Sequence, residues 1–217
     1  MKKNCTELVF ILDRSGSMSG LERDTIGGFN AFVEKQKKAE GEALLSAVLF
    51  SDGSEVIYDR VDIRKVEPMT DAQYCVGGCT ALLDAIGGAV RHIKNVHKYA
   101  REEDRPAKTV FVITTDGMEN ASRNYGYDEV RRIVRHEQEK YGWEFLFLGA
   151  NMDAISAARS FGIRADRAVR YKSDRAGTAL NYDVVGETVA RYRGRASRKI
   201  DADWSAPIEA DVKKRGE

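Results

Sequence analysis

Three oxygen-bearing side chains, Asp13, Ser15 and Ser17, follow directly after the apolar residues 8–12. The apolar residues have the pattern of a buried strand, so a carboxylate and two hydroxyls emerge where that strand ends. Hard oxygens on a tight turn that contains glycine suit a hard divalent cation such as Mg²⁺, which keeps several waters. Taken alone, the same residues also fit a second role, in which Asp13 caps the next helix and the serines fill a polar turn.

Two further segments carry oxygens of the same kind in comparable places. Thr80 ends the glycine-rich turn 77–80 and directly precedes a helical pattern. Asp116 follows residues 110–115, which have another buried-strand pattern, and is itself followed by glycine. Because both segments deliver an oxygen beside a glycine, they favour the metal interpretation of the first turn over the capping one.

At these positions the chain resembles the von Willebrand factor type A (vWA) domain. The metal-ion-dependent adhesion site (MIDAS) of that family consists of the motif D-x-S-x-S, a distant Thr and a distant Asp, and all five positions are filled. The resemblance implies that the two serines bind the metal directly and that the other three residues bind it directly or through water. The implied ion is Mg²⁺, with Mn²⁺ or Ca²⁺ as alternatives, and the implied ligands are Asp13, Ser15, Ser17, Thr80 and Asp116.

The resemblance covers residues 5–193 as a fold, and residues 143–151 and 161–163 look like features of a bacterial or phage intracellular type. It implies a protein-binding module that is not an enzyme. Two carboxylates nearly neutralise a divalent cation, whereas hydroxyl ligands add no charge and leave the cation electrophilic toward one incoming anion. The natural sixth ligand in this family is an Asp or Glu side chain of a partner protein.

Two alternatives stay open at this point. One is a metal-dependent hydrolase of phosphate esters, although the chain lacks the phosphate-binding loop G-x-x-x-x-G-K-[ST] and the fingerprint G-x-G-x-x-G after a strand. Its histidines, His92, His97 and His136, are expected to be partly exposed helix residues away from the ligand-bearing edge rather than general bases. The other alternative is a scaffold in which the metal mainly stabilises the fold.

The charges of the chain are balanced. Lys and Arg number 35 against 34 Asp and Glu, a formal net charge of +1, which argues against bulk attraction to nucleic acid or to an anionic membrane. The only strongly basic run, within residues 191–199, is interpreted as a solvated helix end, because a helix C-terminus favours cations. Arg14 is interpreted either as a pairing site for an acidic partner or as a solvated surface arginine.

With 217 residues and 42% hydrophobic content, the chain is long enough for one domain with a real core. We predict that domain over residues 1–195, followed by a charged tail, 196–217, that packs on the domain or docks to another chain. No stretch approaches the roughly 18 apolar residues of a membrane span. The three cysteines form no CxxC pair, which favours a reducing cytoplasm. Cys75 and Cys79 are expected to be free thiols, with a disulfide between them left open.

Apolar strand patterns alternate with amphipathic helical ones, which is typical of a Rossmann-like three-layer α/β/α sandwich around a mostly parallel sheet. The short turn 51–54 predicts an antiparallel hairpin at one sheet edge, because a parallel crossover needs a longer connection. The charged stretch 101–108 is expected to be an exposed link. Strands are predicted at residues 6–12, 43–50, 55–66, 110–116, 143–148 and 168–171, and helices at 21–39, 81–99, 127–141, 153–161 and 178–193.

This order of elements places the candidate ligands at one edge of the sheet. Asp13, Asp116 and the segment Gly149, Ala150, Asn151 each follow the carboxyl end of a predicted strand. In open α/β sheets, ligands bind outside those ends, where the strand order reverses. Thr80 reaches the same rim from the start of a helix, so the sequence predicts that all five oxygen ligands converge there.

Overall fold

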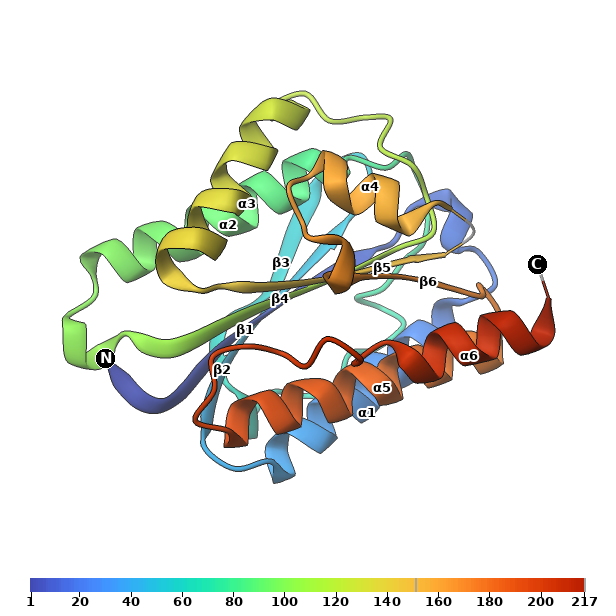
Figure 1. Ribbon diagram of the computed structural model, residues 1–217. Helices are drawn as coiled ribbons and strands as arrows, with labels where there is room; N and C mark the ends of the chain where they lie inside the picture. Colours follow the sequence, from blue (N-terminus) through green and yellow to red (C-terminus); the bar gives the residue numbers. More distant parts are fainter. Residues whose placement is uncertain (151, 217) are drawn as a thin grey trace.

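The computed structural model describes residues 1–150 and 152–216, and its centre is a six-stranded sheet in the order β3-β2-β1-β4-β5-β6 (Figure 1). All neighbouring strands are parallel except β2 and β3, which form an antiparallel edge pair, as predicted. The strands are β1 (Lys2–Asp13), β2 (Glu42–Phe50), β3 (Ser54–Asp62), β4 (Pro106–Thr115), β5 (Glu144–Ala150) and β6 (Ala168–Tyr171).

Helices cover both faces of the sheet, so the predicted three-layer sandwich is confirmed (Figure 1). On β1, Phe10 and its alternate neighbours belong to the same buried cluster as residues of α1, α5 and α6, whereas Val9 and Ile11 belong to the cluster that contains residues of α2, α3 and α4. This alternation follows from the two-residue period of a strand that is buried on both sides. The helices are α1 (Glu22–Lys38), α2 (Leu82–Tyr99), α3 (Tyr127–Tyr141), α4 (Ala154–Ser160), α5 (Arg175–Gly194) and α6 (Ala206–Arg215).

The strand register brings the ends of the central strands to one rim. Asp13 pairs with Phe50 at the end of β2, and Leu12 pairs with Thr114 near the end of β4. Parallel strands all present their carboxyl ends at the same edge, and the connections that leave them therefore meet there. Gly149 and Ala150 end β5 at this rim, whereas Asn151 lies outside the described residues.

Two predicted strand boundaries, the end of β3 and the start of β4, are wrong. The strand predicted to reach residue 66 ends at Asp62, whose side chain accepts a hydrogen bond from the Arg64 backbone N–H and starts a short 3-10 turn. The stretch predicted as an exposed link ends early, because β4 begins at Pro106. Lys108 is buried, and its Nζ donates to the carbonyl of Tyr192 at 2.5 Å.

The C-terminal segment forms a helix that the sequence pattern did not predict. Helix α6 lies against β6 and α5 (Figure 1), with Trp204 and Ile208 buried. The Trp204 indole N–H donates to the carbonyl of Asp166 at 2.9 Å, and Arg215 forms an ion pair with Asp174 at 2.6 Å. The described part of the tail therefore packs on its own chain.

Two polar residues expected at the surface are buried. Arg193 was interpreted as part of a solvated helix end, but its guanidinium donates to the carbonyls of Gln36 and Gly41 at 2.6 and 2.8 Å. His97 was expected to be partly exposed, but it is buried and contacts Glu7 at 3.1 Å. Both predictions were wrong because the partners come from other elements and are not visible in local periodicity. In the described part of the chain, no helix combines the length and apolarity that a membrane crossing requires.

Candidate metal centre

Three loops at the rim are joined to one another by backbone hydrogen bonds. The N–H of Gly16 donates to the carbonyl of Gly78 at 3.0 Å, and the N–H of Gly77 donates to the carbonyl of Arg14 at 2.9 Å. The third loop is joined to the second, because the N–H of Asn120 donates to the carbonyl of Thr80 at 3.0 Å. These bonds fix the relative positions of the three predicted ligand segments.

Asp13 is fully buried at the end of β1. Its Oδ1 accepts a hydrogen bond from the N–H of Ser15 at 2.7 Å, and its Oδ2 accepts one from the hydroxyl of Thr115 at 2.6 Å. The hydroxyl of buried Tyr74 donates to the Asp13 carbonyl. The end of β1 and the Asp13 carboxylate are therefore both held in place by hydrogen-bond donors that carry no charge.

One hydroxyl of the first loop bonds the carboxylate of the third. The Oγ of Ser17 donates to Oδ1 of Asp116 at 2.6 Å and lies 3.0 Å from the Oγ of Ser15. The hydroxyls of Thr80 and Ser17 both lie close to Gly117, the residue after Asp116. A Cβ atom added at Gly117 would lie 2.7 Å from Thr80 Oγ1 and 3.2 Å from Ser17 Oγ. The structure thus brings all five predicted ligand residues together, and glycine is required at 117 for that approach.

Burial disfavours the ionised form of both carboxylates in this cluster. Burial raises the pKa of Asp13, although its hydrogen bonds to Ser15 and Thr115 oppose the shift. Burial also raises the pKa of Asp116, and the negative charge of Asp13 raises it further. A divalent cation between them would remove this repulsion, and the hydroxyls of Ser15, Ser17 and Thr80 are hard oxygen donors suited to Mg²⁺. The residues present therefore fit a hard divalent cation.

Comparisons with known proteins identify the fold. No family model matches the sequence, and no curated protein is significantly similar to it. Among solved structures, the chain is similar to the proximal thread matrix protein 1 of the mussel byssus with a zinc-occupied MIDAS motif, at a TM-score of 0.60 and 17% identity over 85% of this chain and 46% of that one. It is also similar to the vWF domain of the type V pili tip protein Mfa5 from Porphyromonas gingivalis, at a TM-score of 0.57 and 10% identity, covering 89% of this chain and 98% of that one.

A third similar structure is the von Willebrand factor type A protein from Catenulispora acidiphila, at a TM-score of 0.55 and 14% identity over 85% of this chain and 42% of that one. The chain has the vWA fold. It spans about half the length of the byssus structures it matches, at 46%. At such low sequence identities, the structural similarity establishes the fold alone. The function therefore has to be argued from the chemistry of the rim.

Within the vWA fold, the third loop is held by residues that the sequence interpretation missed. The Thr80 N–H donates to Oδ1 of Asn120 at 2.8 Å, which closes a pair of reciprocal bonds between these residues. Glu119 accepts from the N–H groups of Ser122 and Leu83, each at 2.8 Å. The available signal was Glu119, Asn120 and Ser122 shortly after Asp116, because polar side chains in loops often bond nearby backbone N–H groups.

Asp84 holds the far end of the same loop. Its carboxylate accepts hydrogen bonds from the N–H groups of Arg123, Asn124 and Tyr125, each at 2.9 Å. Burial raises the pKa of Asp84, but these N–H bonds together outweigh it, and the pKa lies below its ordinary value. This carboxylate is therefore satisfied as an anion without any cation.

Arg14, between the candidate ligands, has neither of the roles predicted for it. Its Nη1 forms an ion pair with Glu55 at 2.7 Å, and its side chain is only 19% exposed. The pair ties the first loop to the start of β3, which is close because β2 and β3 form a hairpin. Arg14 is thus neither a solvated arginine nor a residue that projects toward a partner.

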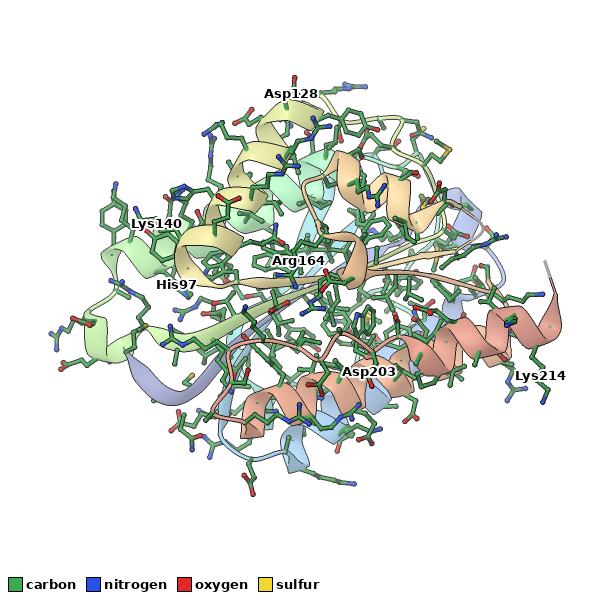
Figure 2. The ribbon with its side chains drawn as sticks, viewed as in Figure 1. His97, Asp128, Lys140, Arg164, Asp203 and Lys214 are labelled. Carbon is green, nitrogen blue, oxygen red and sulfur yellow. The ribbon has the colours of Figure 1, made fainter. Side chains whose placement is uncertain are left out.

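Cysteines and histidines do not contribute to the cluster. Cys75 and Cys79 are exposed free thiols, and a hydrogen bond to Asp52 raises the pKa of Cys79. His97 lies at the opposite end of the sheet from the rim (Figure 2). Among residues 1–150 and 152–216, no group of three or more His, Cys, Asp and Glu side chains is placed to hold a metal. The candidate centre therefore depends on its hydroxyl oxygens.

Proposed function

We propose that the chain is a protein-binding module in which a Mg²⁺-occupied MIDAS accepts an acidic side chain of a partner protein. The observation that carries the proposal is the chain of contacts in which the Ser15 hydroxyl meets the Ser17 hydroxyl and the Ser17 hydroxyl donates to the Asp116 carboxylate, beside a buried Asp13 with no cationic partner among its described contacts. The ligands would be Asp13, Ser15, Ser17, Thr80 and Asp116. When bound, the metal supplies a positive charge that an incoming carboxylate oxygen can complete.

The residues of the chain have distinct roles in this proposal. Asp13 and Asp116 provide the two negative charges that retain the cation. The hydroxyls of Ser15, Ser17 and Thr80 complete part of its shell without adding charge, so the cation still attracts one anion. The Tyr74 hydroxyl donates to the backbone carbonyl of Asp13 and not to its carboxylate. The zinc-occupied MIDAS of the mussel byssus protein supports a divalent metal in this fold, and Mn²⁺ or Ca²⁺ are the alternatives to Mg²⁺ by ligand chemistry.

We further propose that the module is not an enzyme and acts in the cytoplasm, as a bacterial or phage protein with one domain over residues 1–195 and a packed tail. The support for this is the cysteine usage of the chain and the absence, among the described contacts of Asp13 and Asp116, of any histidine that could serve as a general base.

The proposal is tested by metal titration and partner capture with the purified chain. Isothermal titration should show one Mg²⁺ site in the wild type. In Asp116→Ala the affinity should fall by more than the roughly 10- to 100-fold that loss of an outer-shell partner costs. Proteins captured from a lysate of the source organism in Mg²⁺ should be released by EDTA and should not bind Asp116→Ala, whereas circular dichroism should show an unchanged fold.

Asp128→Asn serves as the matched control, because Asp128 is an exposed carboxylate at the start of α3 (Figure 2) and should leave metal affinity and capture unchanged. Capture that resists EDTA would overturn the proposal. So would hydrolysis of a phosphate ester that scales with the metal and disappears in Asp116→Ala, since that result would make the chain an enzyme.

A further inference from the structure

The third loop displays a large apolar side chain beside the candidate metal centre. Met118 is 77% exposed and lies two residues after Asp116. Single exposed apolar residues are common on protein surfaces and by themselves need no explanation. Met118 differs from an ordinary case in how its backbone is held and in what surrounds it.

The backbone on both sides of Met118 is fixed. On one side, Gly117 packs so closely on Thr80 and Ser17 that no side chain fits there. On the other, Asn120 bonds Thr80 in both directions, and Glu119 accepts from Ser122. The backbone that keeps the Met118 side chain exposed is therefore fixed by the same contacts that position the candidate metal ligands.

Other exposed apolar residues lie on segments that leave the rim. Besides Met118, two more of the large apolar residues exposed in the described chain, Tyr127 and Ile155, lie on segments that follow the carboxyl ends of β4 and β5. On the other face of the sheet, the starts of α1 and α5 expose Arg23 and Arg175. Met118 is the one of these exposed apolar residues that lies within two residues of a candidate ligand.

We propose that Met118 is the apolar half of a two-part recognition surface, and that the partner segment carries an Asp or Glu with a large apolar side chain one or two positions away. This inference rests on the proposed function, because the acidic residue is the one that would reach the metal. Cα atoms two residues apart are within about 7 Å of each other, so Met118 and Asp116 match such a spacing in an extended partner segment. Methionine is flexible and polarisable, so we expect it to accept aliphatic or aromatic residues alike.

The test uses a random peptide library displayed on phage and selected on the full chain in Mg²⁺, with elution by EDTA. We expect eluted peptides to contain an acidic residue with a large apolar residue one or two positions away. A synthetic peptide of the enriched sequence should bind Met118→Gln about tenfold more weakly than the wild type, as expected for losing burial of one such side chain. Met118→Leu, which preserves apolar volume, should restore binding.

Tyr99→Gln is the matched control, because Tyr99 is 79% exposed at the end of α2 that lies away from the rim, and its replacement should not change peptide affinity. EDTA-eluted acidic peptides with no apolar preference, or unchanged affinity in Met118→Gln, would overturn this inference and leave the metal-dependent binding proposal standing. A library that yields no EDTA-sensitive peptide overturns both proposals.

Discussion

Strand β1 carries two fully buried carboxylates, Glu7 in its middle and Asp13 at its carboxyl end, and their partners differ in charge. Glu7 accepts from the guanidinium Nε of Arg60 at 3.0 and 3.2 Å and contacts His97 Nε2 at 3.1 Å. Asp13, six residues later, is bonded to an amide and a hydroxyl and to no cation among the described contacts. Burying a carboxylate without a cationic partner is costly.

The difference indicates which of the two carboxylates is open to an external cation. At Glu7, the chain supplies its own positive charge through Arg60, which adopts a left-handed backbone conformation, with φ of +53°. Such a conformation is strained for a residue with a side chain, and it is maintained where the surroundings require it. At the carboxyl end, burial raises the pKa of Asp13, and its neighbour Asp116 adds a second negative charge. A metal ion at the rim would supply the positive charge beside Asp13 that Arg60 supplies beside Glu7.

The largest expected effect comes from removing the internal cation. Arg60→Met should lower the free energy of unfolding by about 3 kcal/mol, because it leaves Glu7 buried with only His97 as a partner. Urea denaturation followed by circular dichroism measures this loss. Arg64→Met is the control, since Arg64 pairs with Asp62 at the surface and its loss should leave the free energy of unfolding nearly unchanged. Equal losses in the two variants would mean that Glu7 needs no cation.

The corresponding change at the rim should behave differently. In EDTA, Asp13→Asn should keep the free energy of unfolding within about 1 kcal/mol of the wild type, because the amide retains an acceptor for the Ser15 N–H and removes a buried charge. In Mg²⁺ at about a hundred times its dissociation constant, the wild type should gain about 2.7 kcal/mol and the variant nothing. Thermal denaturation with and without Mg²⁺ measures both. A variant that unfolds in EDTA would show instead that Asp13 is a structural residue.

The residues that could be predicted from the sequence are those whose neighbours along the chain reveal their role. Asp13 and Asp116 end apolar runs, so strand periodicity was sufficient to place them at the rim. The ion pair of Arg14 with Glu55 depends on how β2 and β3 pair, and the burial of Arg193 depends on how α5 packs on α1. Such contacts are set by tertiary packing, which local patterns do not contain.

Helix α6 was missed for a related reason. It has a weak apolar pattern, since Ile208 is its only fully buried residue, and the preceding Trp204 supplies much of the contact. A helix that is held by a few contacts at its ends gives little periodic signal. The ion pair of Arg215 with Asp174, which caps α5, joins residues that are far apart in the sequence.

The close approach of the third loop to the second offers a finer test of the rim. Gly117→Ala should weaken Mg²⁺ binding about tenfold, because the added methyl group would lie 2.7 Å from Thr80 Oγ1 and push the loops apart. Isothermal titration measures the change. Gly53→Ala is the control, as a Cβ atom there meets nothing within 4 Å and should leave the affinity unchanged. Unchanged affinity in Gly117→Ala would mean that the position of Thr80 relative to Asp116 does not matter for metal binding.

The smallest effect concerns Asp84, a third carboxylate, which the chain satisfies with N–H groups rather than with a cation. Its pKa lies below the ordinary value, so the ionised form stabilises the fold, fully above the unfolded pKa and progressively less as the pH falls through the folded pKa. Asp84→Asn should therefore cost about 1 kcal/mol near pH 7, and the difference from the wild type should shrink below about pH 4. Urea denaturation across this pH range measures it. A difference that grows on acidification would mean that the protonated form is the one that is bonded, and Asp84 would then resemble Asp13, a carboxylate whose ionised form lacks sufficient stabilisation from the chain alone.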